Sequence, residues 1–189
     1  AGGSFSAAAA APSYPASIPF DDYDARRAVR EDNPVSDSFL SSIQAFSLRS
    51  TPAALSAGGE NPLYSPLSLW YALALCADTA GGQTRAQLLT VLGQEEGADL
   101  APQAAALFRL LFTDNEMGHL LLANSLWLNR EFSFHQERLD WAAQYYYAAS
   151  FESDFSDPDT AKQMGQWLSQ ATRNQLEPAV SAPRPEDLM

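Results

Sequence analysis

Few residues in this chain have the types and spacing that catalysis or metal binding requires. His135 and Glu137 form a His-x-Glu pair, as in zinc deaminases, but the cysteines that complete such a site are missing. Asp154, Asp157 and Asp159 are spaced like part of a calcium loop, without its glycine and its terminal glutamate. Because carboxylates stabilise the N-terminus of a helix, we interpret these aspartates as capping residues and His135 as a surface residue.

Two further side chains have the chemistry of a base or a nucleophile. His119 begins an apolar segment, and we interpret it as a strand-end residue rather than a general base. Cys76 lies within an apolar run and is interpreted as a small buried hydrophobic residue. As the single cysteine, it excludes an intramolecular disulfide. The sequence also lacks GxSxG, GxGxxG, P-loop and CxxC motifs, so it predicts no catalytic site, no metal site and no cofactor.

The charge balance argues against two classes of partner. The 189 residues include 11 lysines and arginines against 23 acidic residues, a formal net charge of −12, and the arginines are scattered along the sequence. Nucleic acids and anionic membrane surfaces both require clustered cations, so neither is an expected partner. No apolar run reaches the roughly 18–20 residues of a membrane-spanning helix. A hydrophobic content of 46% with 11% aromatic residues fits a packed domain.

The first 35 residues differ in composition from the rest of the chain. Of residues 1–20, sixteen are Ala, Ser, Pro or Gly, a composition that buries too little apolar surface to offset the entropy of ordering. We interpret residues 1–35 as a flexible tether followed by a charged lead-in with some helix. The stretch lacks the basic start and long apolar middle of a signal peptide. It fits an extracellular or secreted protein tethered at the cell surface, or else an artificial fragment boundary.

The rest of the chain shows about six helical patterns, because apolar residues recur there at helical spacing. Ser65 before a proline is expected to cap one helix, and Thr84 with Gln87 to form a capping box for the next, which ends at Gly93. A Thr-Pro pair at residues 51–52 is expected to end the first. The predicted helices span residues 36–48, 67–77, 84–92, 99–112, 134–149 and 158–171.

Only three short strands are predicted beside these helices, at residues 63–64, 120–128 and 151–155. The second has apolar residues on both parities, so we expect it to be covered on both faces and paired on both edges. Residues 67–77 are apolar on every side and belong in the middle of a domain. The last helix is expected to bury one stripe of side chains: Ala161, Met164, Leu168 and Ala171. Three short strands are too few for a sheet that is covered on both faces. The sequence therefore indicates that this chain is the N-terminal part of a larger α+β domain.

One stretch follows a recognisable pattern: Asn61, Ser65-Pro66, Ser68, an apolar helix, then Gly82, Thr84, Gln87-Leu88 and Leu92-Gly93. It closely resembles the N-terminal signature of the serpins, the serine-protease-inhibitor family. Three later motifs resemble further parts of that fold. Residues 123–127 resemble the second strand of its main sheet, residues 146–155 the end of the next helix and its strand, and residues 167–176 the helix across the sheet. The resemblance covers roughly residues 36–180.

The resemblance implies a protease inhibitor rather than an enzyme. A serpin's target protease, serine-type or in some cases cysteine-type, cleaves an exposed reactive-centre loop. That loop then inserts into the main sheet and the acylated protease is deformed, which releases strain stored in a metastable fold. In the family the loop and the remaining strands lie in the C-terminal half, which is therefore an expected partner of residues 36–189. A serpin-fold protein that binds or carries without inhibiting is the alternative.

The functional residues that the resemblance assigns are mechanical. Asn61, Ser65 and Ser68 match the family's shutter, the polar cluster under the sheet where strands part to admit the loop. Helix capping and ordinary polar packing are the other interpretation, and for Ser65 both can hold. Gly165 stands where many members have asparagine, and a mid-helix glycine costs about 0.5–1 kcal/mol, so a looser helix is expected. The helix around Arg109 has no other cation, unlike that of heparin-activated members, so no heparin binding is expected.

Overall fold

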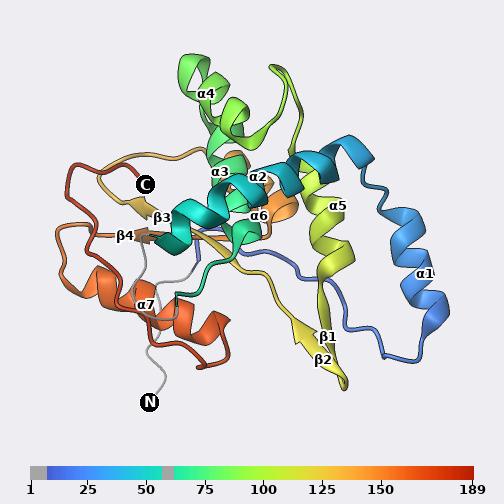
Figure 1. Cartoon of the computed structure of the whole chain (residues 1–189). Coiled ribbons are helices and arrows are strands. Elements are labelled where there is room, and N and C mark those ends of the chain that lie inside the picture. The colour runs from blue at the N-terminus through green and yellow to red at the C-terminus, as the bar shows by residue number, and fades with distance from the viewer. Residues whose placement is uncertain (1–7, 57–61) are drawn as a thin grey trace. The chain divides into compact units, whose positions relative to one another are not determined.

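The computed structural model describes residues 8–56 and 62–189, which group into two compact units. The helical unit is Ser17–Gly118, and the sheet unit is Ala1–Ala16 with His119–Met189. Figure 1 shows the elements of each unit. Helices and strands occur together in the chain, which agrees with the predicted α+β class.

The helical unit packs around a chain of aromatic rings. Trp70 is fully buried, and the ring centroids of Phe39 and Tyr71 lie 5.1 Å and 5.5 Å from its own, both edge-on. The Tyr71 hydroxyl donates a 2.8 Å hydrogen bond to the carbonyl of Ala104, which ties two helices together. The helices in the described part of this unit are α1 (Tyr23–Asp32), α2 (Asp37–Ser56), α3 (Pro66–Thr79), α4 (Gly82–Leu92) and α5 (Ala101–Leu111).

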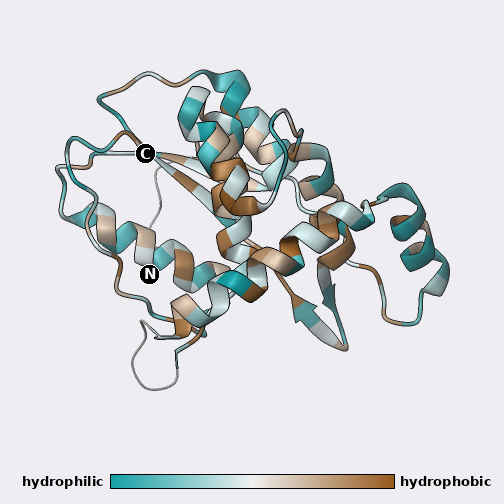
Figure 2. Ribbon diagram, turned by 45° about the horizontal axis from the view of Figure 1, so that its top comes forward, coloured by the Kyte–Doolittle hydropathy of each residue, from teal (hydrophilic) through white to brown (hydrophobic). Residues whose placement is uncertain are grey.

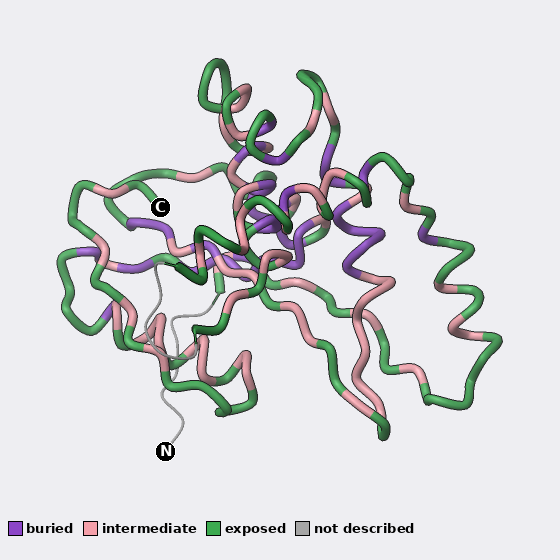
Figure 3. Tube along the Cα trace, viewed as in Figure 1, coloured by how far each residue is buried: buried purple, intermediate pink, exposed green. Residues whose placement is uncertain are grey.

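Burial is uneven among these helices. Figure 3 shows buried residues concentrated in α3 and α5, whereas α1 has no buried residue. Figure 2 shows the same contrast in hydropathy, with α1 largely hydrophilic. The lead-in expected to contain some helix is thus a ten-residue surface helix. Its first turn is capped by Asp22, whose side chain accepts a hydrogen bond from the backbone N–H of Ala25.

Two of the predicted helix boundaries are confirmed and two are wrong. Ser65 caps α3, and Gly93 ends α4 in the left-handed conformation at φ 70°. The capping box of Thr84 and Gln87 does not form, because α4 already begins at Gly82 and Thr84 falls inside its first turn.

α2 continues through Pro52 to Ser56, although the sequence predicts an end at that proline. A proline inside a helix removes one backbone hydrogen bond, here the one to the carbonyl of Leu48. Both Leu48 and Pro52 are exposed, so water can solvate that carbonyl. One residue earlier, the Thr51 hydroxyl donates to the carbonyl of Ser47 at 2.7 Å, a side-chain bond across the same turn of the helix. The two glycines expected to follow as a loop lie outside the described residues.

The sheet unit is built on two parallel strands joined by a helix. Strand β3 (Asn124–Asn129) pairs with β4 (Ala148–Ser153), and α6 (Gln136–Tyr146) connects them. Trp127 faces Phe151 in this register, and their rings stack at 4.8 Å. Helix α7 (Asp159–Ala171) follows, with the ring of Trp167 6.5 Å from that of Phe151. Aromatic contacts therefore hold α7 against the sheet.

All three predicted strands needed correction, and the one expected at residues 151–155 is β4, which begins three residues earlier at Ala148. The single strand expected over residues 120–128 is interrupted: β2 (Gly118–Leu120) ends before an irregular stretch, and β3 starts at Asn124. β2 instead pairs with β1 (Thr113–Asn115) in a hairpin that the sequence analysis missed. The Asn115 side chain accepts from the N–H groups of Met117 and Gly118 at 3.1 Å and 3.2 Å, which forms the turn.

Residues 63–64 form no strand. Leu63 is 90% exposed, and Tyr64 instead donates its hydroxyl to Ser50 in α2 at 2.8 Å. The stripe expected to be buried on α7 is half-buried along its length: Ala161, Met164, Leu168 and Ala171. Thr160 is the buried residue that the structure describes in that helix.

Part of the segment interpreted as a flexible tether is hydrogen-bonded within the sheet unit. Ala9 donates to the carbonyl of Ser150 at 2.7 Å, and Ser150 donates to the carbonyl of Ala10 at 2.8 Å. This antiparallel bridge pairs the edge of β4 that faces away from β3. Ala10 is buried there, so order in this short stretch comes from backbone pairing rather than from large side chains.

Candidate functional site: the start of helix α3

The start of α3 carries two of the three residues assigned to the shutter. Ser65 is the N-cap of α3 and its backbone is extended, so its side chain folds back over the first turn. Its hydroxyl oxygen accepts from the backbone N–H of Ser68 at 3.2 Å and lies 2.8 Å from the Ser68 hydroxyl. Both serines are exposed, and Asn61 lies outside the described residues. The serine pair therefore has a capping geometry.

No base is hydrogen-bonded to either serine among the residues that the structure describes. A serine nucleophile needs such a base to remove its proton. What this arrangement does chemically is to satisfy one free N–H at the helix start. The second hydroxyl adds a polar link that a capping role alone does not require.

The histidines and aspartates considered as catalytic or metal-binding residues lie apart. His135 is exposed at the N-terminus of α6, and His119 is exposed in β2. The Asp154 and Asp157 carboxylates accept from the backbone N–H groups of Ser156 and Asp159, both at 2.9 Å. These bonds organise the turn before α7, but the N-cap of α7 is Pro158 and no side chain in the described part of the chain caps the helix, so the predicted capping role is wrong and only Asp159 lies in the first turn. Within the described residues, no group of three His, Cys, Asp or Glu is arranged to hold a metal ion.

Cys76 is half-buried rather than buried as predicted, since α3 leaves part of that face uncovered. Burial nonetheless raises the pKa of the Cys76 thiol. The thiol is therefore more strongly protonated near neutral pH than an ordinary cysteine, which makes it a poor nucleophile.

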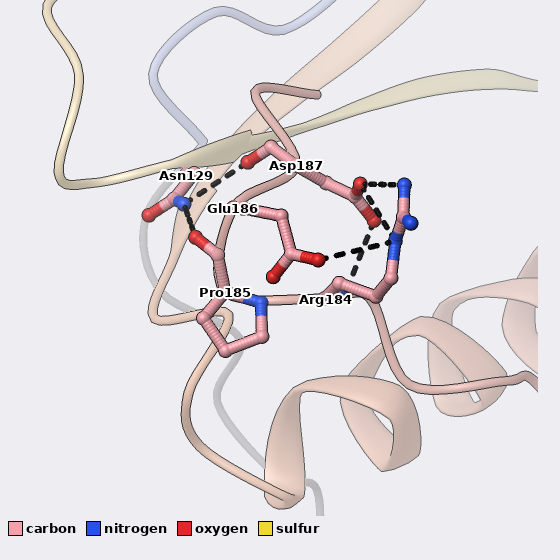
Figure 4. A network of polar contacts seen from close by, with 5 residues as sticks. All are labelled: Asn129, Arg184, Pro185, Glu186 and Asp187. Atoms are coloured by element: carbon pink, nitrogen blue, oxygen red, sulfur yellow. Dashed lines mark hydrogen bonds and ion pairs between the residues drawn. The ribbon is translucent and has the colours of Figure 1, made fainter.

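A polar network at the end of β3 was not anticipated from the sequence (Figure 4). The side-chain amide of Asn129, which is 1% exposed, donates to the carbonyls of Pro185 and Asp187 at 2.8 Å and 3.0 Å. The backbone N–H of Asn129 also donates to the carbonyl of Leu188 at 3.2 Å. The C-terminal residues are thus fastened to the last residue of β3. The available sequence signal was an asparagine, Asn129, directly after the apolar residues of a predicted strand.

An exposed ion pair closes the same turn. Arg184 contacts Asp187 at 2.7 Å through its guanidinium, and the Arg184 backbone N–H donates to the same carboxylate at 2.9 Å. The guanidinium hydrogen bond lowers the pKa of Asp187, and the same bond raises the pKa of Arg184. The i, i+3 spacing of opposite charges around a proline was the sequence signal for this turn.

Gly165 has a packing role that sequence reasoning missed. A Cβ at this position would lie 3.1 Å from the carbonyl oxygen of Pro178. The glycine therefore lets the segment after α7 pass close over the helix, so its missing side chain is replaced by backbone contact. The expectation of a looser helix considered the flexibility of glycine alone and did not include this contact.

The family model of the serpins, described as serine protease inhibitors, matches residues 41–189. The chain is 32% identical over 140 residues to Serpin-ZXA of Oryza sativa subsp. japonica, covering 68% of this chain and 35% of that protein. It is 30% identical over 148 residues to Serpin A11 of Mus musculus, covering 76% of this chain and 34% of that protein.

Solved structures agree with the family match. A loop C-sheet serpin polymer matches with a TM-score of 0.71 and 28% identity, over 82% of this chain and 41% of the other. The native state of tengpin, a thermophilic serpin, gives a TM-score of 0.68 at 25% identity, over 82% and 40%. The chain belongs to the serpin family, whose members are in general inhibitors rather than catalysts.

The chain spans about a third of the length of the curated relatives it matches. Among the described residues, none of the helices combines the length and the apolar character needed to cross a membrane.

Proposed function

We propose that this chain is the N-terminal part of an inhibitory serpin that, when full length, acts on a serine-type endopeptidase. Cysteine-type endopeptidases are the second target class. The mechanism is that of a suicide substrate: the protease cleaves the reactive-centre loop, which inserts into the main sheet before the acyl-enzyme is hydrolysed. The protein itself performs no catalysis, needs no cofactor, and is extracellular or secreted.

The single observation that carries this proposal is the sheet unit in its serpin order. Parallel strands β3 and β4 are joined by α6, and α7 is held against β4 by the Phe151–Trp167 contact. A loop-inserting inhibitor needs a sheet of this kind that can accept a further strand. Along the edge of β3 that faces away from β4, the described residues show one backbone hydrogen bond, from the N–H of Asn129 to the carbonyl of Leu188.

Residues 36–189 alone are expected to inhibit nothing, because the reactive-centre loop belongs to the C-terminal half with which they would assemble. The full-length protein is incubated with elastase-, trypsin- and subtilisin-like enzymes, and denaturing gels detect a covalent complex. A complex with the full-length protein and none with residues 1–189 supports the proposal. A covalent complex with residues 1–189 alone refutes the assignment of the loop to the missing half.

The shutter role of Asn61, Ser65 and Ser68 can be separated from helix capping. Ser65→Ala removes the cap of α3 and should cost about 0.5–2 kcal/mol of stability. Ser68→Ala keeps the 3.2 Å bond from its backbone N–H and removes only the link between hydroxyls. A shutter role predicts that Ser68→Ala changes the number of inhibitor molecules consumed per protease inhibited, while far-UV circular dichroism stays unchanged. An unchanged ratio leaves only the capping role.

The alternative function is binding or carriage without inhibition. The test is again the full-length protein, since a carrier is cleaved in its loop without trapping the protease. Heparin is not an expected partner of either form, because the net charge is −12 and the helix containing Arg109 has no second cation. Elution from a heparin column below roughly 0.3 M salt, where exposed charge pairs are already largely screened, is the expected result.

A further inference from the structure

The helical unit contains a cavity of about 800 Å³ beside α1. Its walls come from the segment before α1, from α1 itself, from the beginning of α2, and from the end of α5 with β1 (Figure 1). Most of the wall is apolar and includes Ile18, Val29, Leu40, Leu110 and Phe112. Small-molecule sites typically have volumes of about 300–1,000 Å³ and mostly apolar walls with a few polar groups. This cavity fits that description.

Three arginines line the cavity, against one carboxylate, that of Asp114. They are Arg26 and Arg30 of α1 and Arg109 of α5. The chain has ten arginines and one lysine at a net charge of −12, and the arginines are scattered along the sequence. The fold brings three of them to one cavity. The cavity wall therefore carries an excess of positive charge in an acidic protein.

Arg26 is held in position by aromatic rings. Its guanidinium carbon lies 5.1 Å from the ring centroid of Phe20 and 5.0 Å from that of Tyr23. Its Nε atom is buried and has no hydrogen-bond partner among the described residues. A buried donor without an acceptor is unfavourable, and such groups call for an explanation. An anion bound in the cavity would supply the missing acceptor.

The other two arginines complete the charge pattern. Arg30 forms no ion pair within the described residues, although the acidic residues Glu31 and Asp32 follow it in the chain. Arg109 donates from Nε to the side-chain oxygen of Asn33, which orients its guanidinium. Asn33 is itself fixed, because its amide donates to the carbonyl of Val29 at 2.8 Å.

Hydrogen bonds also fix the wall opposite α1. The Asn115 amide donates to the carbonyl of Ile18 at 3.1 Å, and the backbone N–H of Phe20 donates to Glu116 at 3.0 Å. The Ser17 hydroxyl adds a bond to the carbonyl of Asp114. A wall formed before the ligand arrives lowers the entropy cost of binding.

From this geometry we propose that the cavity binds a small amphipathic carboxylate, a single anionic head on an apolar body of the fatty-acid kind. Arg26 and Arg30 hold the carboxylate, because a guanidinium pairs with a carboxylate through two parallel hydrogen bonds. The apolar wall covers the body. A sulfated polysaccharide needs a row of exposed cations instead, and much of this wall is apolar. The site is independent of the proposed protease inhibition, so each can fail without the other.

The test is calorimetric titration of the full-length protein, in which this unit is completed by the C-terminal half, with laurate below its micelle-forming concentration. Dodecanol, which has the same apolar body and no charge, is the matched ligand control. The variants are Arg26→Gln and Arg30→Gln, and the matched protein control is Arg27→Gln. Arg27 lies on the same helix, is exposed, and pairs with Asp24 at 2.6 Å outside the cavity.

We expect saturable laurate binding at one site, weakened by at least about tenfold in Arg26→Gln, since a charged hydrogen bond is lost. Arg30→Gln, at an exposed position with no fold-supporting contact, should weaken binding in the same direction. Arg27→Gln should leave affinity within about twofold, as expected for a screened surface charge. These three results together support the site.

Four outcomes overturn the proposal. They are no binding by the unmodified protein, equal affinity for dodecanol, equal weakening by Arg27→Gln, or tighter binding of a heparin tetrasaccharide than of laurate. The first two exclude a carboxylate site, the third reduces binding to net charge, and the fourth assigns the arginines to a sulfated sugar. A far-UV circular dichroism spectrum of each variant that matches the unmodified protein shows that the losses are local.

Discussion

The two units differ in how completely each closes its own core. In the helical unit, Trp70 is fully buried among aromatic rings contributed by α2, α3 and α5. In the sheet unit, Trp127 and Trp167 remain half-buried around Phe151. A helix satisfies its own backbone, whereas a strand needs a partner on each edge and cover on each face. Helices can therefore complete a core locally, whereas a two-stranded sheet cannot.

The largest expected difference between the two units is in how they unfold when the chain is isolated. We expect residues 1–189 alone to lack a single cooperative transition, with slow amide exchange kept in α3 and α5 and lost from β3, β4 and α7. Each large side chain left in water forfeits roughly 1.5–3 kcal/mol, against a typical net stability of about 5–15 kcal/mol. Hydrogen exchange followed by mass spectrometry measures this directly.

Adding the complementary C-terminal half should restore protection in β3 and β4. One sharp transition in the monomeric chain, with equal protection in both units and no binding of hydrophobic dyes, would show that this half is an autonomous domain. The proposed dependence on the missing strands would then be wrong.

The second prediction compares one tryptophan from each unit. Trp70→Ala should cost about 3–5 kcal/mol, because it empties a fully buried position. Trp167→Ala should cost clearly less, since that side chain is half-buried and its one recorded aromatic contact is 6.5 Å from Phe151. Urea denaturation of each variant gives the two values.

Trp70→Phe is the control for the first of these variants. The Trp70 indole N–H is buried without a partner among the described residues, so phenylalanine removes an unsatisfied donor while filling most of the space. We expect a much smaller loss than for alanine. Equal losses for Trp70→Ala and Trp167→Ala would remove the contrast between the units.

The third prediction concerns the fastening of the C-terminal residues to β3. Asn129→Ala deletes the amide donors to Pro185 and Asp187 and should destabilise that contact by about 1–3 kcal/mol. NMR amide shifts of Asp187 and Leu188 should move toward random-coil values. Asn129→Asp keeps the size and removes the donors, so it should reproduce the effect. Unchanged shifts in both variants would show that the amide does not hold the segment.

What could be predicted from the sequence follows the same division. Ser65 and Gly93 mark helix ends through bonds within a few residues, so local patterns were sufficient for them. The break between β2 and β3 was missed because the two strands have different partners: β2 pairs with β1 in a short hairpin, whereas β3 pairs with β4, 24 residues further along the chain. The passage of α2 through Pro52 depends on solvent exposure that the local pattern does not reveal. Local periodicity does not reveal which strands pair or which residues are exposed to solvent.

The candidate sites divide in the same way. The bond between Ser65 and Ser68 spans three residues and follows from a capping motif. The arginine cavity brings together Arg26 of α1 and Arg109 of α5, which are 83 residues apart in the sequence, so composition and spacing left its cations scattered. Whether the arginine charges act together depends on the distances between them in the folded structure, which the sequence does not give.

The fourth prediction tests the close passage over α7. Gly165→Ala improves helix propensity by about 1 kcal/mol, but its Cβ would lie 3.1 Å from the Pro178 carbonyl. We expect little net gain in stability and faster cleavage after Glu177 by a glutamyl endopeptidase, because the covering segment is displaced. Gln170→Ala, an exposed position on the same helix, is the control and should leave cleavage unchanged. Higher stability with unchanged cleavage would show that the segment has room for the methyl group.

The smallest expected effect is the pH response of the exposed turn that includes Asp187. Its pKa lies below the ordinary value of 3.8, chiefly because the Arg184 side chain hydrogen-bonds the carboxylate, with help from the Arg184 backbone N–H. A carboxyl whose pKa is lower in the folded state stabilises the fold above its unfolded pKa, and that contribution disappears as pH falls through the folded value. The Asp187 side-chain carbon should therefore titrate by NMR below pH 3.8. Arg184→Gln should return the midpoint toward that value, and high salt should reduce the shift because both groups are exposed. Arg138→Gln, an arginine that lies over Trp141 instead, should leave the midpoint in place. If Arg184→Gln leaves it unchanged as well, the turn is not closed by this pair, and the Asn129 bonds alone fasten these residues to the sheet unit.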